Sequence, residues 1–207
     1  MRPILFLLVL GTLAVNSTFA QKQSYKVAIV GFYNLENLFD TIDNPMVDDN
    51  EFSPNGPRRY DATIYKDKLT KLATVISQMG TEMNPDGPAI LGVAEVENDT
   101  VLQDLVRHPL LEKRGYRIVH YDSRDARGID VGLLYNPKYF TPEQSDKLFV
   151  QLPTGSKDAY YTRDVLWVKG KFDGETIHVY VNHWPSRSGG EKRSEPGRRA
   201  AAQVCRN

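Results

Sequence analysis

Four polar residues stand where strand-like apolar runs begin or end, at Asn34, Glu95, Asp130 and His183. Side chains in the middle of such a strand are packed, whereas those at its ends can face a cleft. A carboxylate and an amide offer the oxygen ligands that a hard cation such as Mg²⁺ prefers. An imidazolium beside a carboxylate can donate a hydrogen bond to a charged oxygen. Together these residue types could bind a divalent cation and donate a hydrogen bond to a charged oxygen beside it.

Each of these residues also has an ordinary structural explanation when it is taken alone. Asn34 can cap a turn, and Asp130 can pair with the nearby Arg127. A lone histidine at a strand end is more often a hydrogen-bonding residue than a catalyst. The functional interpretation therefore depends on the whole set and its order along the chain.

Two other kinds of site fit the sequence less well. A zinc site built from His178 and His183 is disfavoured, because their odd spacing puts them on opposite faces of a strand. A serine hydrolase is disfavoured, because Ser186 lies in no Gly-X-Ser-X-Gly turn.

The segments around the four residues resemble, in the same order, motifs of the endonuclease/exonuclease/phosphatase superfamily. The segments are residues 32–39, 92–98, 127–135 and 181–187, and the resemblance extends over residues 25–207. The family's first strand ends in an Asn-Leu pair, here Asn34-Leu35, and its second ends in a Gln-Glu pair, here Ala94-Glu95. The resemblance implies that Glu95 binds the catalytic metal and that Asn34 lies beside the metal and the phosphate. It implies Mg²⁺ or Mn²⁺ as the cofactor, with Ca²⁺ as a further candidate.

The same resemblance assigns the remaining site residues. Asp130 looks like the family's acidic residue that orients a histidine, and His183 looks like that histidine, so both are expected to be catalytic. Arg163 looks like the arginine that contacts substrate phosphate, and we assign Asn182 and Arg187 to the phosphate as well. The sequence of residues 182–187 most resembles the corresponding motif of secreted bacterial nucleases of this family.

The function implied by the resemblance is metal-dependent hydrolysis of phosphodiesters by an exported nuclease, with nucleic acid as substrate. One alternative is a phosphatase or phospholipase-type phosphodiesterase acting on inositol or lipid phosphates. Another is a non-catalytic binding module of the same fold. The family's later Gly-Asp-Phe-Asn-like loop and closing Ser-Asp-His do not follow His183 in this sequence. We therefore expect a truncated chain, comprising the N-terminal two thirds of the domain, with weak or no activity.

Hydrophobic periodicity predicts the elements that position these residues. Strands are expected at residues 27–32, 89–96, 116–121, 129–135, 165–172 and 176–182, and helices at 65–79, 100–107 and 196–206. The turns after Pro109 are short, which favours antiparallel pairing because parallel strands need long crossovers. The expected fold is α+β, with two packed, mainly antiparallel sheets flanked by helices in a deoxyribonuclease-like four-layer sandwich that is incomplete at the C-terminus.

This arrangement leads to a specific expectation about Asp130 and His183. If strands 129–135 and 176–182 pair antiparallel, the start of one lies beside the end of the other. The two side chains would then meet, and Asp130 would raise the pKa of His183.

The N-terminus has the order of a secretory signal peptide. A basic start is followed by a short apolar run and by small residues before position 21. We expect residues 1–20 to be removed, residues 21–207 to form one domain, and the protein to be periplasmic or extracellular. We expect no stable membrane association and see no sign of a protein partner. The single cysteine, Cys205, excludes an internal disulfide.

The distribution of charge adds one observation. A net charge of zero argues against a protein that coats nucleic acid through bulk charge. Residues 183–207 nevertheless carry six arginines and lysines against two glutamates. A basic surface there suits a phosphate-bearing ligand, and a solvated helix face explains the same pattern equally well.

Overall fold

The computed structural model describes residues 26–153 and 162–206 of the chain. Its strands are β1 (Ile29–Leu38), β2 (Pro88–Val96), β3 (Arg117–His120), β4 (Asp130–Tyr135), β5 (Phe140–Leu148), β6 (Val165–Phe172) and β7 (Glu175–Val181). Its helices are α1 (Ala62–Gln78), α2 (Asp99–Val106) and α3 (Glu191–Val204), and short 3-10 turns lie at Asn50–Phe52 and Glu112–Arg114. The expected signal peptide, residues 1–20, lies outside the described residues.

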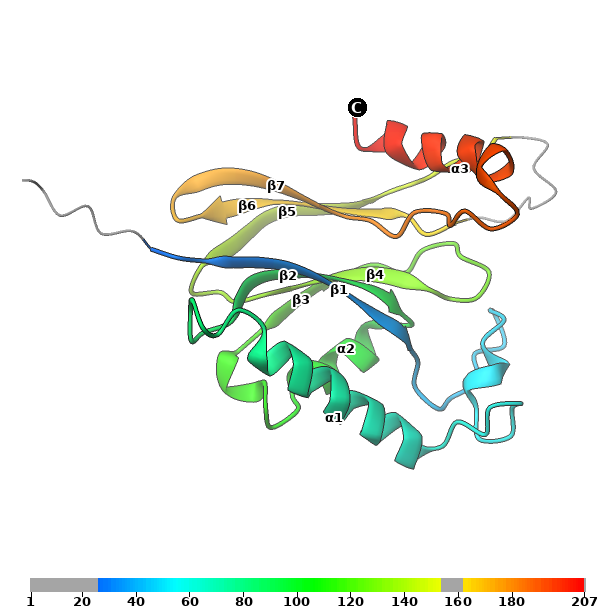
Figure 1. Cartoon of the computed structure of the whole chain (residues 1–207), viewed down its shortest axis with the longest axis horizontal. Helices are drawn as coiled ribbons and strands as arrows, with labels where there is room; N and C mark the ends of the chain where they lie inside the picture. Colours follow the sequence, from blue (N-terminus) through cyan, green and yellow to red (C-terminus); the bar gives the residue numbers. More distant parts are fainter. Residues whose placement is uncertain (1–25, 154–161, 207) are drawn as a thin grey trace, which may run out of the picture.

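The elements form four layers (Figure 1). The helices α1 and α2 cover one face of a sheet with the strand order β1-β2-β4-β3, and a second sheet, β5-β6-β7, packs on its other face. The helix α3 lies on the outer side of the second sheet. All strand pairs are antiparallel except β1 with β2, so the expected α+β sandwich of two mainly antiparallel sheets is confirmed. None of these three helices is both long enough and apolar enough to cross a bilayer.

The parallel pair β1 and β2 needs a crossover, which α1 provides. The helix begins at Ala62, about a turn before the expected start, because the Asp61 side chain accepts hydrogen bonds from the backbone N–H groups of Thr63 and Ile64. Such an N-cap satisfies amides that the first helical turn leaves without partners. The buried face of α1 packs on β2 and consists of Leu69, Leu72, Ala73 and Ile76.

The strand β2 lies in the middle of the fold and is buried on both faces. Leu91 and Val93 pack in the cluster between the first sheet and the helices, whereas Ile90 and Ala94 pack in the cluster between the two sheets. This alternation follows from the period of two in a strand. An apolar strand enclosed on both faces holds the residue at its end, Glu95, in a fixed place.

The two sheets approach each other closely beside Gly92. A Cβ atom at this position would lie only 3.2 Å from side-chain atoms of Phe32 and Val181. Glycine therefore allows β7 of the second sheet to pack directly over β2, which brings the end of β7 near the end of β2.

The largest differences from the expected elements concern β1, α3 and β5. The strand β1 continues to Leu38, and α3 begins at Glu191 instead of residue 196. The strand β5 was not expected, because most of its side chains are polar or exposed and it contains Pro142. It is an edge strand, and its register shifts between Pro142 and Gln144, which are the circumstances that permit proline in a sheet.

The expected pairing of residues 129–135 with 176–182 is wrong. The strand β4 lies in the first sheet between β2 and β3, and β7 lies in the second sheet beside β6. The two strands face each other across the sandwich and share no hydrogen-bonded register.

A buried carboxylate secures the segment that follows β1. The side chain of Glu97 is almost fully buried, and its Oε2 atom accepts a hydrogen bond of 2.6 Å from the backbone N–H of Asp40. Burial is the main cause that raises the pKa of Glu97 to about 7, and the charges of Asp40 and Asp49 raise it further.

The raised pKa of Glu97 predicts a specific dependence of stability on pH. The folded state binds a proton more tightly than the unfolded state, so the stabilisation is complete below the ordinary pKa of 4.5 and is lost as pH rises to about 7. Between these pH values the free energy of unfolding of the wild type should fall by up to about 3 kcal/mol. Glu97→Gln stays neutral, so its free energy of unfolding should not show this fall. Urea unfolding of chelator-treated protein at several pH values measures the difference, and parallel pH profiles for the two proteins would contradict this account.

Candidate active site

The backbone at Glu95 has an uncommon conformation. Its φ of 60° is left-handed, and the register of β2 against β4 shifts between Ala94 and Val96. A left-handed conformation costs a residue with a side chain about 1–2 kcal/mol. The register shift is a β-bulge, and bulges redirect side chains and are frequent beside active sites. The conformation presents the Glu95 carboxylate at the end of β2.

Two side chains from other strands converge on one oxygen of Glu95. Nδ2 of Asn34 on β1 donates a hydrogen bond of 2.9 Å to Oε1, and Nε2 of His183, just after β7, lies 3.3 Å from the same atom. The side chains of His183 and Glu95 are 21% and 20% exposed, so a solute can reach both. The structure therefore brings together three of the four residues that the sequence singled out.

The other half of the Asn34 amide is fixed by its own strand. Its Oδ1 atom accepts a hydrogen bond of 2.8 Å from the backbone N–H of Glu36. Glu36 and Asn37 both have positive φ, at 54° and 59°, where the register of β1 against β2 is interrupted. Both strand ends at this site thus carry strained backbone.

The electrostatic surroundings of His183 differ from the expectation. Burial lowers its pKa most, the charge of Arg163 lowers it further, and the charge of Glu95 opposes these effects. The expected increase in its pKa through Asp130 is therefore wrong. In the described part of the chain, the buried Nδ1 atom of His183 has no hydrogen-bond partner. A neutral ring that donates from Nε2 toward Glu95 fits this arrangement.

Asp130 has partners other than His183. Its Oδ1 atom accepts a hydrogen bond of 2.8 Å from the backbone N–H of Ser123, and its Oδ2 atom lies 3.3 Å from Nε2 of His120. The predicted pairing of Asp130 with His183 is wrong, because the carboxylate of Asp130 contacts Ser123 and His120 whereas His183 contacts Glu95.

Arg163 is held by an aspartate that the sequence analysis missed. Its Nη1 atom donates to Oδ2 of Asp125 at 3.1 Å, and the two side chains are only 12% and 6% exposed. Asp125 lies in the irregular loop between β3 and β4, where no periodic pattern marks a residue as special. The Nε atom of Arg163 is buried without a hydrogen bond to any described residue.

The structure does not bring the other two assigned phosphate contacts to this cluster. Oδ1 of Asn182 accepts hydrogen bonds from Nε1 of Trp184 and from Sγ of Cys205, both at 3.1 Å. Its amide therefore secures α3 and the segment after β7. Arg187 is exposed in the loop that precedes α3.

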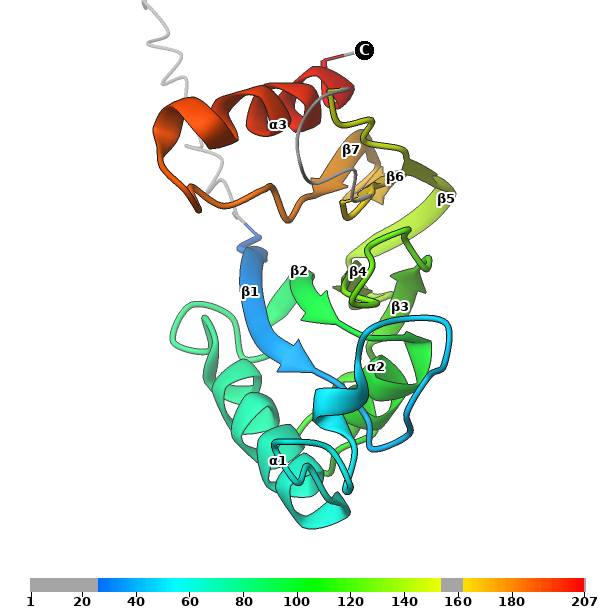
Figure 2. The same ribbon diagram turned by 90° about the vertical axis from the view of Figure 1, so that its right-hand side faces the viewer.

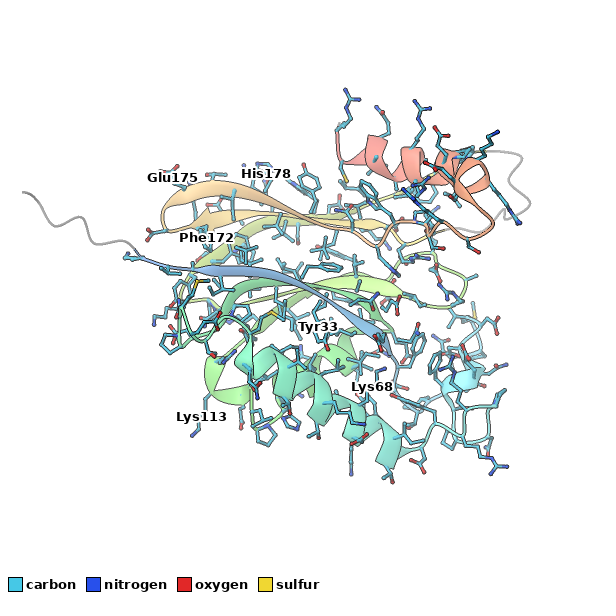
Figure 3. All side chains as sticks on the ribbon, in the orientation of Figure 1. Tyr33, Lys68, Lys113, Phe172, Glu175 and His178 are labelled. Atoms are coloured by element: carbon cyan, nitrogen blue, oxygen red, sulfur yellow. The ribbon has the colours of Figure 1, made fainter. Side chains whose placement is uncertain are left out.

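A cavity of about 640 Å³ extends from Asn34 along α1. Lys68 on α1 was not anticipated, and its Nζ donates a hydrogen bond of 2.6 Å to the backbone oxygen of Glu36. Burial lowers the pKa of Lys68, and the charges of Glu36 and Glu95 oppose that effect. Figure 3 shows Tyr33 on β1 and Lys68 on α1, which both line this cavity.

The donor set at the end of β2 fits a divalent cation. The Glu95 carboxylate provides the oxygen atoms that Mg²⁺ and Mn²⁺ prefer in a partly exposed cluster, and the Asn34 amide orients it by donating from Nδ2. A cation there would lie beside the His183 ring and within reach of solvent.

Solved structures of other proteins have the same fold as this chain. An endonuclease/exonuclease/phosphatase from Bacteroides vulgatus is 18% identical, with a TM-score of 0.50 over 84% of this chain and 56% of that one. A humanized TDP2 from D. rerio carrying 14 mutations is 12% identical, with a TM-score of 0.51 over 85% of this chain and 58% of that one. The chain thus spans less than two thirds of the length of either protein. No curated protein matches the sequence.

The sequence profile of the Endonuclease/Exonuclease/phosphatase family matches residues 29–207. This match covers both sheets and every residue of the cluster around Glu95. The profile and the shared sandwich together show that the chain belongs to the endonuclease/exonuclease/phosphatase family, whose members are hydrolases acting on phosphate esters.

Proposed function

We propose that this chain forms the metal-binding part of an exported nuclease that hydrolyses phosphodiesters with Mg²⁺ or Mn²⁺. The observation that carries the proposal is the convergence of Asn34 and His183 on one oxygen of Glu95. In this proposal, Glu95 and Asn34 hold the cation. A bound cation withdraws charge from a phosphoryl oxygen.

His183 has a role that follows from its lowered pKa. A neutral imidazole has one N–H group, which faces Glu95 from Nε2 in this structure, and a cation bound to the carboxylate would free it to donate to a non-bridging phosphate oxygen. Donors directed at developing charge in a partly dehydrated site contribute strongly to catalysis. We assign this role to the His183 ring, whose side chain is 21% exposed.

Arg163 supplies positive charge beside His183. Asp125 holds one end of the guanidinium, and the planar fork leaves further N–H groups to bind a phosphate. The charge of Arg163 already affects His183 through its pKa, so both residues act on the same region.

The choice of nucleic acid as substrate rests on charge. Figure 2 looks onto the end of the sandwich where β1 and β2 finish, with α3 lying above it. This helix and the residues just before and after it carry Arg187, Lys192, Arg193, Arg198, Arg199 and Arg206. A row of cations beside a phosphoryl site suits a ligand with several phosphates.

We expect residues 1–20 to be absent from the protein that the native host exports. The reason is the basic, apolar and small-residue order of this segment. Mass spectrometry of the periplasm and medium should find an N-terminus at Gln21, and an intact Met1 form in the cytoplasm as the main species would contradict export.

Two substitutions separate metal binding from catalysis. Glu95→Gln keeps the shape and removes the charge, so calorimetry should show at least about tenfold weaker Mg²⁺ or Mn²⁺ binding. His183→Ala should leave that affinity nearly unchanged and, in a full-length version, lower hydrolysis of DNA or RNA about 100-fold or more. His178→Ala is the matched control, because His178 lies on the outer side of the second sheet (Figure 3).

Each outcome of these assays decides one point. Unchanged metal affinity in Glu95→Gln would refute the assigned ligand. Release of phosphate from inositol or lipid phosphates without cleavage of nucleic acid would favour the alternative function, a phosphatase or phospholipase-type phosphodiesterase. Metal binding with no hydrolysis of any of these substrates would support the binding module.

Asp125→Asn tests the placement of Arg163. Loss of the buried carboxylate charge leaves the guanidinium unbalanced, so the free energy of unfolding should fall by about 2–3 kcal/mol. Asp173→Asn is the control, since its pair with Lys26 is exposed and should contribute less than about 1 kcal/mol. Equal unfolding midpoints for the two variants in urea would show that Asp125 does not secure Arg163.

A further inference from the structure

A second group of metal-binding side chains lies where β3 ends and β4 begins. The register pairs Arg117 with Tyr135 and His120 with Gly132, so its continuation places Asp122 opposite Asp130. His120 and Asp122 are two residues apart and therefore share a face of the hairpin. The backbone thus gathers one imidazole and two carboxylates on one face.

The burial of this group is unusual for charged and polar residues. The side chains of His120 and Asp130 are both only 3% exposed, and Nε2 of His120 lies 3.3 Å from Oδ2 of Asp130. The two atoms are not aligned for a hydrogen bond, and Nε2 has no hydrogen-bond partner in residues 26–153 and 162–206. A buried polar nitrogen without a partner requires an explanation, and one explanation is an ion.

The spacing of the atoms fits a cation. Two ligands that each lie about 2.0–2.1 Å from a tetrahedral metal are separated by roughly 3.3 Å. One candidate ligand atom from each of His120, Asp122 and Asp130 lies within 4.8 Å of the others. The Asp122 side chain is 85% exposed and stands 3.9 Å from Nδ1 of His120, so it would turn through solvent to reach an ion at Nε2.

The local charges point in the same direction. Two carboxylates that face each other across a strand pair repel. The Nζ atom of Lys147 donates to the backbone oxygen of Asp122 at 2.6 Å. A positive ion between the carboxylates would remove their repulsion.

We propose that His120, Asp122 and Asp130 form a second cation site, which takes Zn²⁺ or another nitrogen-accepting divalent ion in preference to Mg²⁺. An imidazole ligand favours Zn²⁺, whereas Mg²⁺ prefers oxygen alone. The site shares no residue with the group formed by Asn34, Glu95 and His183. Water completes the coordination on the exposed side of Asp122.

An ion at this place would stabilise the loop between β3 and β4. Asp122 and Asp130 lie near the two ends of that loop, and the loop carries Asp125, which holds Arg163. Binding at the second site would therefore secure a residue of the first site without touching it.

The test uses the whole chain after chelation, in a Cys205→Ser background that removes the single thiol. Calorimetry with Zn²⁺ measures affinity, and the visible absorption of bound Co²⁺ reports nitrogen coordination. Asp122→Asn should weaken Zn²⁺ binding about tenfold, and His120→Gln should weaken it about 100-fold and abolish the Co²⁺ bands. Glu95→Gln should keep the Zn²⁺ binding that Asp122→Asn weakens, and the control His178→Gln should leave both signals unchanged.

The exposed position of Asp122 keeps the test decisive. Asp122→Asn removes no buried contact, so it should fold even if His120→Gln does not, and circular dichroism checks both. Wild-type Zn²⁺ affinity in Asp122→Asn would overturn the proposal. Loss of all Zn²⁺ binding in Glu95→Gln would also overturn it, because the ion would then belong to the first site.

Discussion

The site depends on one atom, Oε1 of Glu95, at which three strands meet. Asn34 reaches it from β1, and His183 approaches it from the end of β7 in the other sheet. The geometry of the site is therefore set by how the two sheets pack. The left-handed backbone at Glu95 persists because β2 is enclosed on both faces, and the packing energy of that strand exceeds the local strain.

The loop between β3 and β4 is the second constraint on the site. It carries Asp125, which orients Arg163, and Asp130 fixes it by accepting from the backbone of Ser123. Its backbone also contacts the segment after β1, since Asp48 donates a hydrogen bond to the carbonyl of Ala126. Two loops that are distant in sequence thus support each other, and the charge of Arg163 acts on His183 through this arrangement.

The sequence predicted the layers and most strands, because apolar periodicity records which faces are buried. It also identified Glu95, Asn34 and His183, which the structure brings together. The sequence analysis missed β5, because its mostly polar side chains show no apolar periodicity. The prediction that Asp130 pairs with His183 was wrong for a different reason. Sequence spacing suggested which strands were antiparallel but did not say which sheet each one joins, so the partners of Asp130 and Arg163 required the tertiary structure.

The close approach of the two sheets at Gly92 has a consequence for the order in which the protein comes apart. Glu95 and His183 stand on different sheets, and no backbone hydrogen bond in the described residues joins those sheets into one ladder. Side-chain packing alone sets the distance between them. A small widening, in warm solution or dilute denaturant, would separate Glu95 from His183 while each sheet keeps its own hydrogen bonds. The group around Glu95 would then come apart before the secondary structure is lost.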